Sequence, residues 1–243
     1  MPYFTGINDL QKLRLNLEKE PIINSSILGF LENNLVTEIL SVGNSYIVKG
    51  ISDREWIYFS SKDEKEFRTL LTRLYPSDNC FASIEDWMIP EIVKRGKIDW
   101  QLTTMRYYLQ ENSLIPENKV KLIQLKTKDA GYIRDNSNYK KYLPIKYLKQ
   151  RIEQSFSAGV IENNKLVAWV ITHDDGAIGA LHVLDDYRNK GYAAEIIISM
   201  SKKIRSAGRI PIAQIEEINS PAIKLFEKLG FVKDRRVTWL VLK

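Results

Sequence analysis

The stretch Asp185-Asp186-Tyr187-Arg188-Asn189-Lys190-Gly191-Tyr192-Ala193 decides how this chain is interpreted. The apolar segment 177–184 before it predicts a strand, and the amphipathic segment 192–206 after it predicts a helix. The first N–H groups of a helix have no partner inside the helix, and the helix dipole is positive at that end. A strand that enters a glycine-containing turn at a helix start is therefore a natural anion site.

Three residues of this turn suit a phosphate ligand. Gly191 lets a ligand approach the backbone closely, and Arg188 and Lys190 carry the complementary charge. The same residues also fit an ordinary strand–turn–helix connection in which the glycine serves only the backbone geometry. The turn alone leaves both interpretations open, and the rest of the sequence decides between them.

The composition is that of an ordinary globular protein. The chain has 243 residues, 44% hydrophobic and 27% charged, which is enough for one large or two small domains. A single cysteine, Cys80, excludes an intramolecular disulfide, and segment 1–6 is too short and polar for a targeting helix, so we expect a cytoplasmic protein. No apolar run approaches the roughly 20 residues that span a bilayer, so we expect no membrane partner. Two histidines and one cysteine disfavour a structural zinc site, and we expect no metal.

The formal net charge is +6, with a sequence pI near 9.2. Basic surfaces attract nucleic acids, but they also attract polyanionic cofactors. Lysine and arginine are scattered among acidic residues, and the densest clusters, 121–128 and 140–149, do not alternate with aromatic residues as in RNA-binding sheets. We therefore expect a surface that attracts a cofactor and no nucleic-acid partner.

The N-terminal half predicts a mixed α/β domain over residues 1–115. The expected helices are 9–18, 26–33, 63–74 and one that begins at Ser83 as N-cap, and the expected strands are 38–42, 45–49, 55–60 and 100–109. Gly43-Asn44 predicts a hairpin turn, and the polar segment 111–118, with Pro116, predicts a linker.

The C-terminal half, residues 119–243, predicts a second domain. The expected strands are 119–125, 156–162, 166–172, 177–184, 210–215 and 231–242. The expected helices are 128–139, as one helix or two short ones, 144–154, 192–206 and one that begins at Ser220-Pro221. Asn163-Asn164 predicts a hairpin turn, Ser220 is the expected N-cap, and Gly230 lies where a helix C-cap belongs.

This order of elements and two motifs resemble the GNAT family of acyl-CoA-dependent N-acyltransferases. The first motif is Arg188-Asn189-Lys190-Gly191-Tyr192-Ala193, and the second is Asn219 followed by Leu225-Phe226-Glu227-Lys228-Leu229-Gly230-Phe231. The run 179–188 is most similar to the glycine N-acyltransferase-like and FR47-like branch. Members of that branch often carry an extra α/β domain, a role that residues 1–115 fit, and a degenerate copy of the same fold is one form that domain could take.

The resemblance implies an α/β fold in which a mixed, mostly antiparallel sheet is flanked by helices. It also implies acetyl-CoA, or another acyl-CoA, as the donor. The pantetheine arm would lie between strand residues 181–184 and 212–216, in contact with Leu181, Val183 and Leu184. The pyrophosphate would bind the amides of residues 189–193, and an N–H near Val183 or Leu184 would stabilise the oxyanion. Asn219 and Phe226 would lie at the cofactor.

The proton chemistry departs from the family pattern. Many relatives carry a tyrosine acid where this chain has Phe226, so water or the Asn219 amide would assist thiolate departure. The positions that carry a base in some relatives, near Ala177 and Gly179, hold no titratable group. Glu217 and His182 are the leading candidates for the base, because His has a side-chain pKa near neutrality and Glu217 follows the next strand. Glu216, His173, Asp174 and Asp175 are further candidates, and an amine of lowered pKa would need no base.

Three functions remain open from the sequence. The leading prediction is an N-acyltransferase that acts on a small amine or an amino acid by direct attack. A catalytically silent acyl-CoA-binding protein is the second, and acetyl-CoA binding without turnover would favour it. An aminoacyl-tRNA-dependent transferase is the third, and it predicts RNA affinity that falls steeply with salt. The acceptor, the acyl chain length and the oligomeric state stay open, although Trp100, Tyr107, Tyr108 and Trp169 could line an acceptor pocket.

Overall fold

The fold is described from a computed structural model, and the description covers residues 7–138, 140 and 143–243. Segment 1–6, the end of the predicted helix 128–139 and part of the basic cluster 140–149 therefore lie outside the described residues. The chain divides into two compact units: Met1–Arg106 together with Asp234–Lys243, and Tyr107–Lys233. The expected domains 1–115 and 119–243 stay a prediction.

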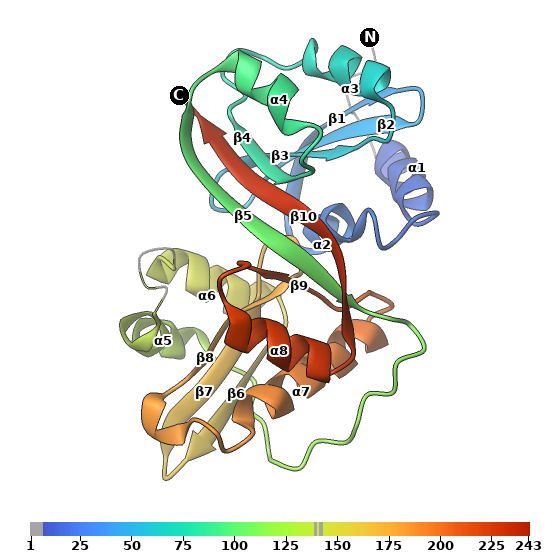
Figure 1. Cartoon of the computed structure of the whole chain (residues 1–243). Helices are drawn as coiled ribbons and strands as arrows, with labels where there is room; N and C mark the ends of the chain where they lie inside the picture. The colour runs from blue at the N-terminus through green and yellow to red at the C-terminus, as the bar shows by residue number, and fades with distance from the viewer. Residues whose placement is uncertain (1–6, 139, 141–142) are drawn as a thin grey trace. The chain divides into compact units, whose positions relative to one another are not determined.

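The first unit consists of a sheet with helices on both faces (Figure 1). Its elements are α1 (Ile7–Leu17), α2 (Ser25–Asn33), β1 (Leu35–Val42), β2 (Ser45–Ile51), β3 (Glu55–Ser60), α3 (Glu64–Leu71), β4 (Cys80–Ile84), α4 (Ile89–Ile92), η1 (Val93–Arg95), most of β5 (Ile98–Leu109) and most of β10 (Phe231–Leu242). The strand order is β1-β2-β3-β4-β10-β5. Successive residues of a strand face opposite sides of the sheet. Ile47 of β2 therefore packs in the hydrophobic core under α3 and α4, and Val48 packs in the core under α1 and α2.

The second unit has the same layered form. Its elements are η2 (Thr127–Asp129), α5 (Ala130–Asn136), α6 (Ile145–Gln154), β6 (Ser157–Glu162), β7 (Lys165–Thr172), β8 (Ile178–Val183), η4 (Asp185–Tyr187), α7 (Tyr192–Ser206), β9 (Ile212–Ile215), α8 (Ser220–Lys228) and the ends of β5 and β10. The strand order is β5-β9-β8-β7-β6. Trp169 and Ile171 of β7 pack against α5 and α6, and Figure 1 shows α7 and α8 on the other side of these strands.

The two units repeat one order of elements. In the first, β1, β2 and β3 are antiparallel, α3 follows, and β4 returns parallel to β3. In the second, β6, β7 and β8 are antiparallel, α7 follows, and β9 returns parallel to β8. The predicted mixed, mostly antiparallel α/β architecture is confirmed. No helix in the described part of the chain is long and apolar enough to cross a membrane.

Strong local patterns were predicted accurately. The Asn163-Asn164 turn has φ values of 52° and 61°, the left-handed geometry of a tight hairpin. The predicted bounds of α7 (Tyr192–Ser206) and β3 (Glu55–Ser60) match the observed elements. Periodicity and turn chemistry determine these elements because their signals lie within one segment of the chain.

Three local predictions are wrong. Ser83 does not cap a helix but lies in β4 at φ 55°, because strand pairing with β3 and β10 overrides its capping preference. Residues 119–125 form no strand and pair only through an isolated bridge between Ile123 and Gly159. The N-cap of α8 is Asn219, whose side chain accepts a hydrogen bond from the Ala222 N–H at 3.3 Å, so Ser220 is the first helical residue.

A buried ion pair joins β5 to β10 within the first unit. The Arg106 guanidinium donates to Asp234 Oδ2 through Nε at 2.8 Å and through Nη2 at 2.6 Å, and the side chains are 2% and 10% exposed. Arg106 also donates to the Ile23 carbonyl at 3.3 Å. A nearby ion pair between Arg236 and Asp86 is longer, 3.8 Å, and about half exposed on both sides.

We expect Asp234→Ala to lower the free energy of unfolding by about 3 kcal/mol, because it leaves a buried guanidinium without its carboxylate. The matched variant Asp86→Ala removes an exposed partner and should cost no more than about 1 kcal/mol. Urea denaturation of the three proteins measures both values. Equal losses in the two variants would contradict a structural role for the buried pair.

Candidate functional site

Strands β8 and β9 pair over a very short length. They run parallel, and their register contains one pair, Ile178 with Ala213. Ile178 is buried, whereas every later residue of β8 is half-buried. The side of β8 that faces away from β7 is therefore unpaired beyond Ile178. A free strand edge of this kind can bind an extended ligand through its peptide groups, as a peptide adds to a sheet.

A β-bulge lies in β8 at the start of this unpaired edge. Gly179 pairs with Ile171 and His182 pairs with Trp169, so Val170 alone faces two residues, Ala180 and Leu181. Ala180 has φ 50°, a left-handed conformation that is uncommon for a residue with a side chain. A bulge bends its strand and redirects the peptide groups beside it, which is why bulges are frequent next to active sites.

The hydrogen bonds to β7 identify which amide of β8 is available. The Leu184 N–H donates to the Val167 carbonyl at 2.9 Å, so it is used within the sheet. Alternate residues of an antiparallel strand direct their N–H groups to opposite sides, and the Val183 N–H therefore points away from β7. Of the two expected oxyanion donors, Val183 has the suitable direction and Leu184 does not.

The loop after β8 has the backbone of an anion site. It passes through η4, then Asn189 at φ 62° and Gly191 at φ 83°, and enters α7 at Tyr192. The first hydrogen bond of the helix joins the Glu195 N–H to the Gly191 carbonyl, so the amides of residues 192–194 precede it. Gly191, as N-cap, provides no side-chain cap, and a Cβ atom there would meet nothing within 4 Å.

The cations of the loop each have an acidic neighbour. Arg188 Nη2 lies 2.7 Å from Asp185 Oδ1, and Lys190 Nζ lies 3.1 Å from Glu162 Oε1. Tyr192 also donates its hydroxyl to Glu162, and these bonds from Tyr192 and Lys190 lower the pKa of the Glu162 carboxyl. Nothing in the sequence pattern identified Glu162, because it is a single acid at the end of β6.

His182 lies on the α5/α6 face of β8. Its ring stacks on Trp169 with a centroid separation of 4.7 Å. Burial and the Arg188 charge lower the pKa of His182, and Asp185 opposes them. Trp169 itself is fully buried, so it belongs to the core of the second unit and does not line an open pocket.

The three candidate residues that follow β9 have different surroundings. Glu217 is exposed beyond the end of the strand, and Asn219 caps α8. Phe226 is 3% exposed and packs edge-on against Phe231 at 4.9 Å, so the position of the family tyrosine is an apolar core position. Phe226 has no hydroxyl group and therefore cannot protonate a leaving group.

The turn between β7 and β8 forms a buried polar cluster. Asp174 and Asp175 are 4% and 1% exposed. Asp175 accepts hydrogen bonds from the Ala177 N–H at 3.1 Å and from the Gln214 amide of β9. Arg151 of α6 lies 3.8 Å from Asp174. These contacts hold β8 and β9 together at the end where the two strands pair.

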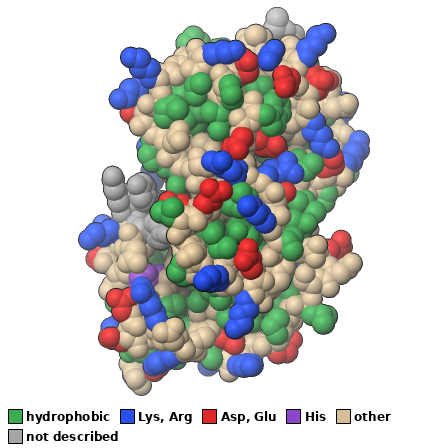
Figure 2. All heavy atoms as spheres, viewed as in Figure 1, with side chains coloured by type: hydrophobic (Ala, Val, Ile, Leu, Met, Phe, Trp, Pro, Cys, Tyr) green, Lys and Arg blue, Asp and Glu red, His purple; other side chains and the backbone are tan. Residues whose placement is uncertain are grey.

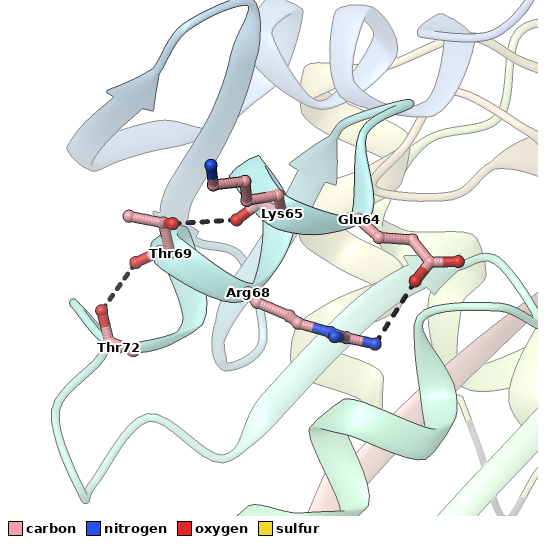
Figure 3. Close-up of a pocket in the computed structure, with 5 residues that line it drawn as sticks. All are labelled: Glu64, Lys65, Arg68, Thr69 and Thr72. Atoms are coloured by element: carbon pink, nitrogen blue, oxygen red, sulfur yellow. Dashed lines mark hydrogen bonds and ion pairs between the residues drawn. The ribbon is translucent and has the colours of Figure 1, made fainter.

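Two described features of the first unit, Cys80 and a surface hollow on α3, lack the chemistry of the loop before α7. Burial raises the pKa of the Cys80 thiol, so it is a poor nucleophile. The hollow drawn in Figure 3 lies on one face of α3, where Thr69 and Thr72 bond to helix carbonyls and Arg68 pairs with Glu64. Among the described residues, no group of three or more His, Cys, Asp and Glu side chains is arranged to hold a metal ion.

The face of the molecule drawn in Figure 2 carries both signs of charge. On the face drawn in Figure 2, Lys and Arg side chains are interspersed with Asp and Glu. Cations in the loop before α7 are likewise paired with Asp185 and Glu162. The positive charge at this site therefore comes from a few residues and from the helix start.

Comparison with known proteins agrees with this arrangement. Residues 157–240 match the model of the family described as FR47-like protein. A solved structure of a Drosophila protein has a TM-score of 0.69 at 17% identity, over 85% of this chain and 79% of that chain. A GNAT-family acetyltransferase from Colwellia psychrerythraea has a TM-score of 0.57 at 15% identity, over 100% of this chain and 99% of that chain.

A third structure, an N-acetyltransferase-like protein from Streptococcus suis, has a TM-score of 0.56 at 15% identity, over 98% of this chain and 100% of that chain. No curated protein sequence matches the chain. At these identities the solved structures establish the fold, and the family model identifies the segment that contains β8, the loop and α7. The chain therefore has the fold of the GNAT acetyltransferases to which it is similar, and its residues 157–240 match the FR47-like family model.

Proposed function

We propose that this protein is an acyl-CoA-dependent N-acyltransferase that transfers an acyl group, with acetyl the first candidate, to the amine of a small molecule or amino acid. The observation that carries the proposal is that the unpaired edge of β8 leads through one loop, residues 184–191, to the uncapped start of α7. A phosphate-bearing thioester needs both features, an anion site and a free strand edge, at a fixed separation.

The donor would bind along this edge. Its pyrophosphate would lie on the amides of residues 189–193, beside Arg188 and Lys190. Its pantetheine arm would extend along Leu181 and Val183, where β8 and β9 diverge. The Val183 N–H would then face the thioester oxygen, and a donor placed in this way stabilises the oxyanion by roughly 3 kcal/mol.

The corresponding helix start in the first unit is unsuited to phosphate. Asp63, the N-cap of α3, accepts a hydrogen bond from the Glu66 N–H at 2.8 Å, and Glu64 and Glu66 add negative charge to the first turn. A carboxylate thus occupies the place where a phosphate would bind. We propose that the first unit is a copy of the same fold that has no donor site, and that one acyl-CoA binds per chain.

A catalytically silent acyl-CoA-binding protein is the second candidate. The buried Phe226 favours it, because this position has no hydroxyl that could protonate the leaving thiolate. Gly179 favours it as well, since no side chain of β8 at that position can accept a proton.

Substitution of Gly191 tests the donor site. Gly191→Ala should raise the dissociation constant for acetyl-CoA at least about tenfold, because the added methyl group lies where the pyrophosphate approaches the backbone. Gly208→Ala is a matched control: Gly208 follows α7 at φ 72°, and a Cβ atom there also meets nothing within 4 Å. Both variants should lose about 1 kcal/mol of stability from the left-handed backbone. Isothermal titration calorimetry separates them, and equal affinities would contradict the assignment.

Turnover distinguishes the two candidate functions. We expect acetyl-CoA to bind with a stoichiometry of one and to release free thiol when a panel of amino acids and aliphatic amines is added. Thiol release is followed with a chromogenic disulfide reagent, with acetyl-CoA alone as the control. Binding without thiol release on any amine would favour the silent protein, and the absence of binding would contradict both functions.

A further inference from the structure

We propose that His173 is the proton acceptor of the reaction and takes the place of the side chain that Gly179 lacks. The proposal rests on the proposed acyl transfer. His173 is the first residue after β7, whereas Gly179 is the second residue of β8. The His173 side chain therefore approaches β8 from the turn that precedes this strand.

The space above Gly179 is filled by the His173 imidazole. A Cβ atom placed on Gly179 would lie 2.2 Å from both Nε2 and Cδ2 of His173. Such a separation is shorter than any van der Waals contact, so the ring occupies the volume that a side chain at residue 179 would take. Glycine is required at this position because any larger residue would displace the imidazole.

This imidazole lies on the face of β8 that also carries His182. Gly179 pairs with Ile171 and His182 pairs with Trp169, and paired strand residues project to the same face. Ile171 and Trp169 both pack toward α5 and α6. The unpaired edge of β8 begins after Ile178, so His173, which lies over Gly179, is beside the first residues of that edge. The bulge at Ala180 lies between Gly179 and His182.

Tyr147 of α6 holds the ring in place. The Tyr147 hydroxyl lies 3.0 Å from His173 Nδ1, and the two rings are stacked with centroids 6.3 Å apart. In the tautomer that we propose, Nδ1–H donates to the Tyr147 oxygen, so Nε2 is unprotonated and carries the lone pair that accepts the proton. Catalytic histidines are commonly held in this way: a hydrogen-bond partner on one ring nitrogen orients the second ring nitrogen toward the proton.

Burial favours the neutral form of the His173 imidazole. Burial lowers the pKa of His173, Arg151 of α6 lowers it further, and Asp174 opposes both by favouring the imidazolium. Asp175 faces the same turn and is held by Gln214 of β9. A neutral imidazole can accept a proton, and Asp174 stabilises the imidazolium once it forms.

The proton balance closes without another reactant. The amine nitrogen attacks the thioester carbonyl carbon, a C–N bond forms, and the N–H proton moves to Nε2 of His173. The tetrahedral intermediate then expels the thiolate as the C–S bond breaks. The imidazolium returns its proton to the thiolate sulfur, so the absence of a tyrosine hydroxyl at Phe226 does not prevent turnover.

Kinetics at varied pH test the proposal. With acetyl-CoA and the amine panel, His173→Gln should lower kcat about 100-fold or more, which is the usual contribution of a general base, and leave the acetyl-CoA dissociation constant within about twofold. Wild-type kcat should rise with pH along an acidic limb and level off below the ordinary histidine pKa of about 6.5. Glu217→Gln and His182→Gln are measured in parallel. The proposal is overturned if either of these variants loses kcat while His173→Gln keeps the wild-type kcat and pH profile.

Two further variants separate the role of the base from folding. Tyr147→Phe should lower kcat and change the apparent pKa without changing the acetyl-CoA affinity, because Tyr147 acts only through the orientation of His173. Gly179→Ala should reproduce the kcat loss by displacing the ring while both histidines remain. Unchanged kcat in a folded Gly179→Ala protein would contradict the proposal.

An NMR measurement does not depend on the acceptor. The chain has two histidines, so the spectrum of His182→Gln assigns both imidazoles. His173 should titrate below the ordinary histidine pKa, and its signals should shift when acetyl-CoA saturates the protein. Acetyl-CoA binding that leaves the His173 signals in place, or binding without thiol release on any amine, overturns the role of His173. Failure of acetyl-CoA to bind contradicts the proposed function itself.

Discussion

The short pairing of β8 with β9 is the constraint on which the rest of the site depends. Because the register contains only Ile178 with Ala213, the later peptide groups of β8 have no strand partner on that side. Unpaired backbone groups away from water are costly, so this edge is stable only if it is solvated or occupied by a ligand. The hydrogen bond between Gln214 and Asp175 holds the strands together at the paired end, and the bulge at Ala180 turns β8 beyond it.

The loop before α7 adds a second, electrostatic element at the far end of that edge. Asn189 and Gly191 adopt left-handed backbone conformations, and the amides of the helix start remain uncapped. Glu162 orients Tyr192 and Lys190 through direct hydrogen bonds. The backbone and side chains of this loop are therefore already arranged, and such preorganisation would reduce the entropy that binding of the proposed donor must overcome.

The two units share an order of elements but differ at the start of one helix. The sheet order around β3 and β4 matches that around β8 and β9. The difference lies in a few residues at the start of the following helix, Asp63 in one unit and Gly191 in the other. A fold supplies the scaffold, and individual side chains decide whether it can bind an anion.

The sequence by itself determined the features whose signals are local. The periodicity of 192–206, the turn at Asn163-Asn164 and the loop at Gly191 predicted their elements correctly, and the motif around Arg188 lies in the segment that matches the FR47-like family model. Only the tertiary structure decided the features that join distant segments. Strand pairing placed Ser83 in β4, Glu162 of β6 contacts Tyr192 of α7, and the turn between β7 and β8 brings His173 over Gly179. Local preferences cannot specify such contacts, because each depends on how the strands of the sheet pair and bend.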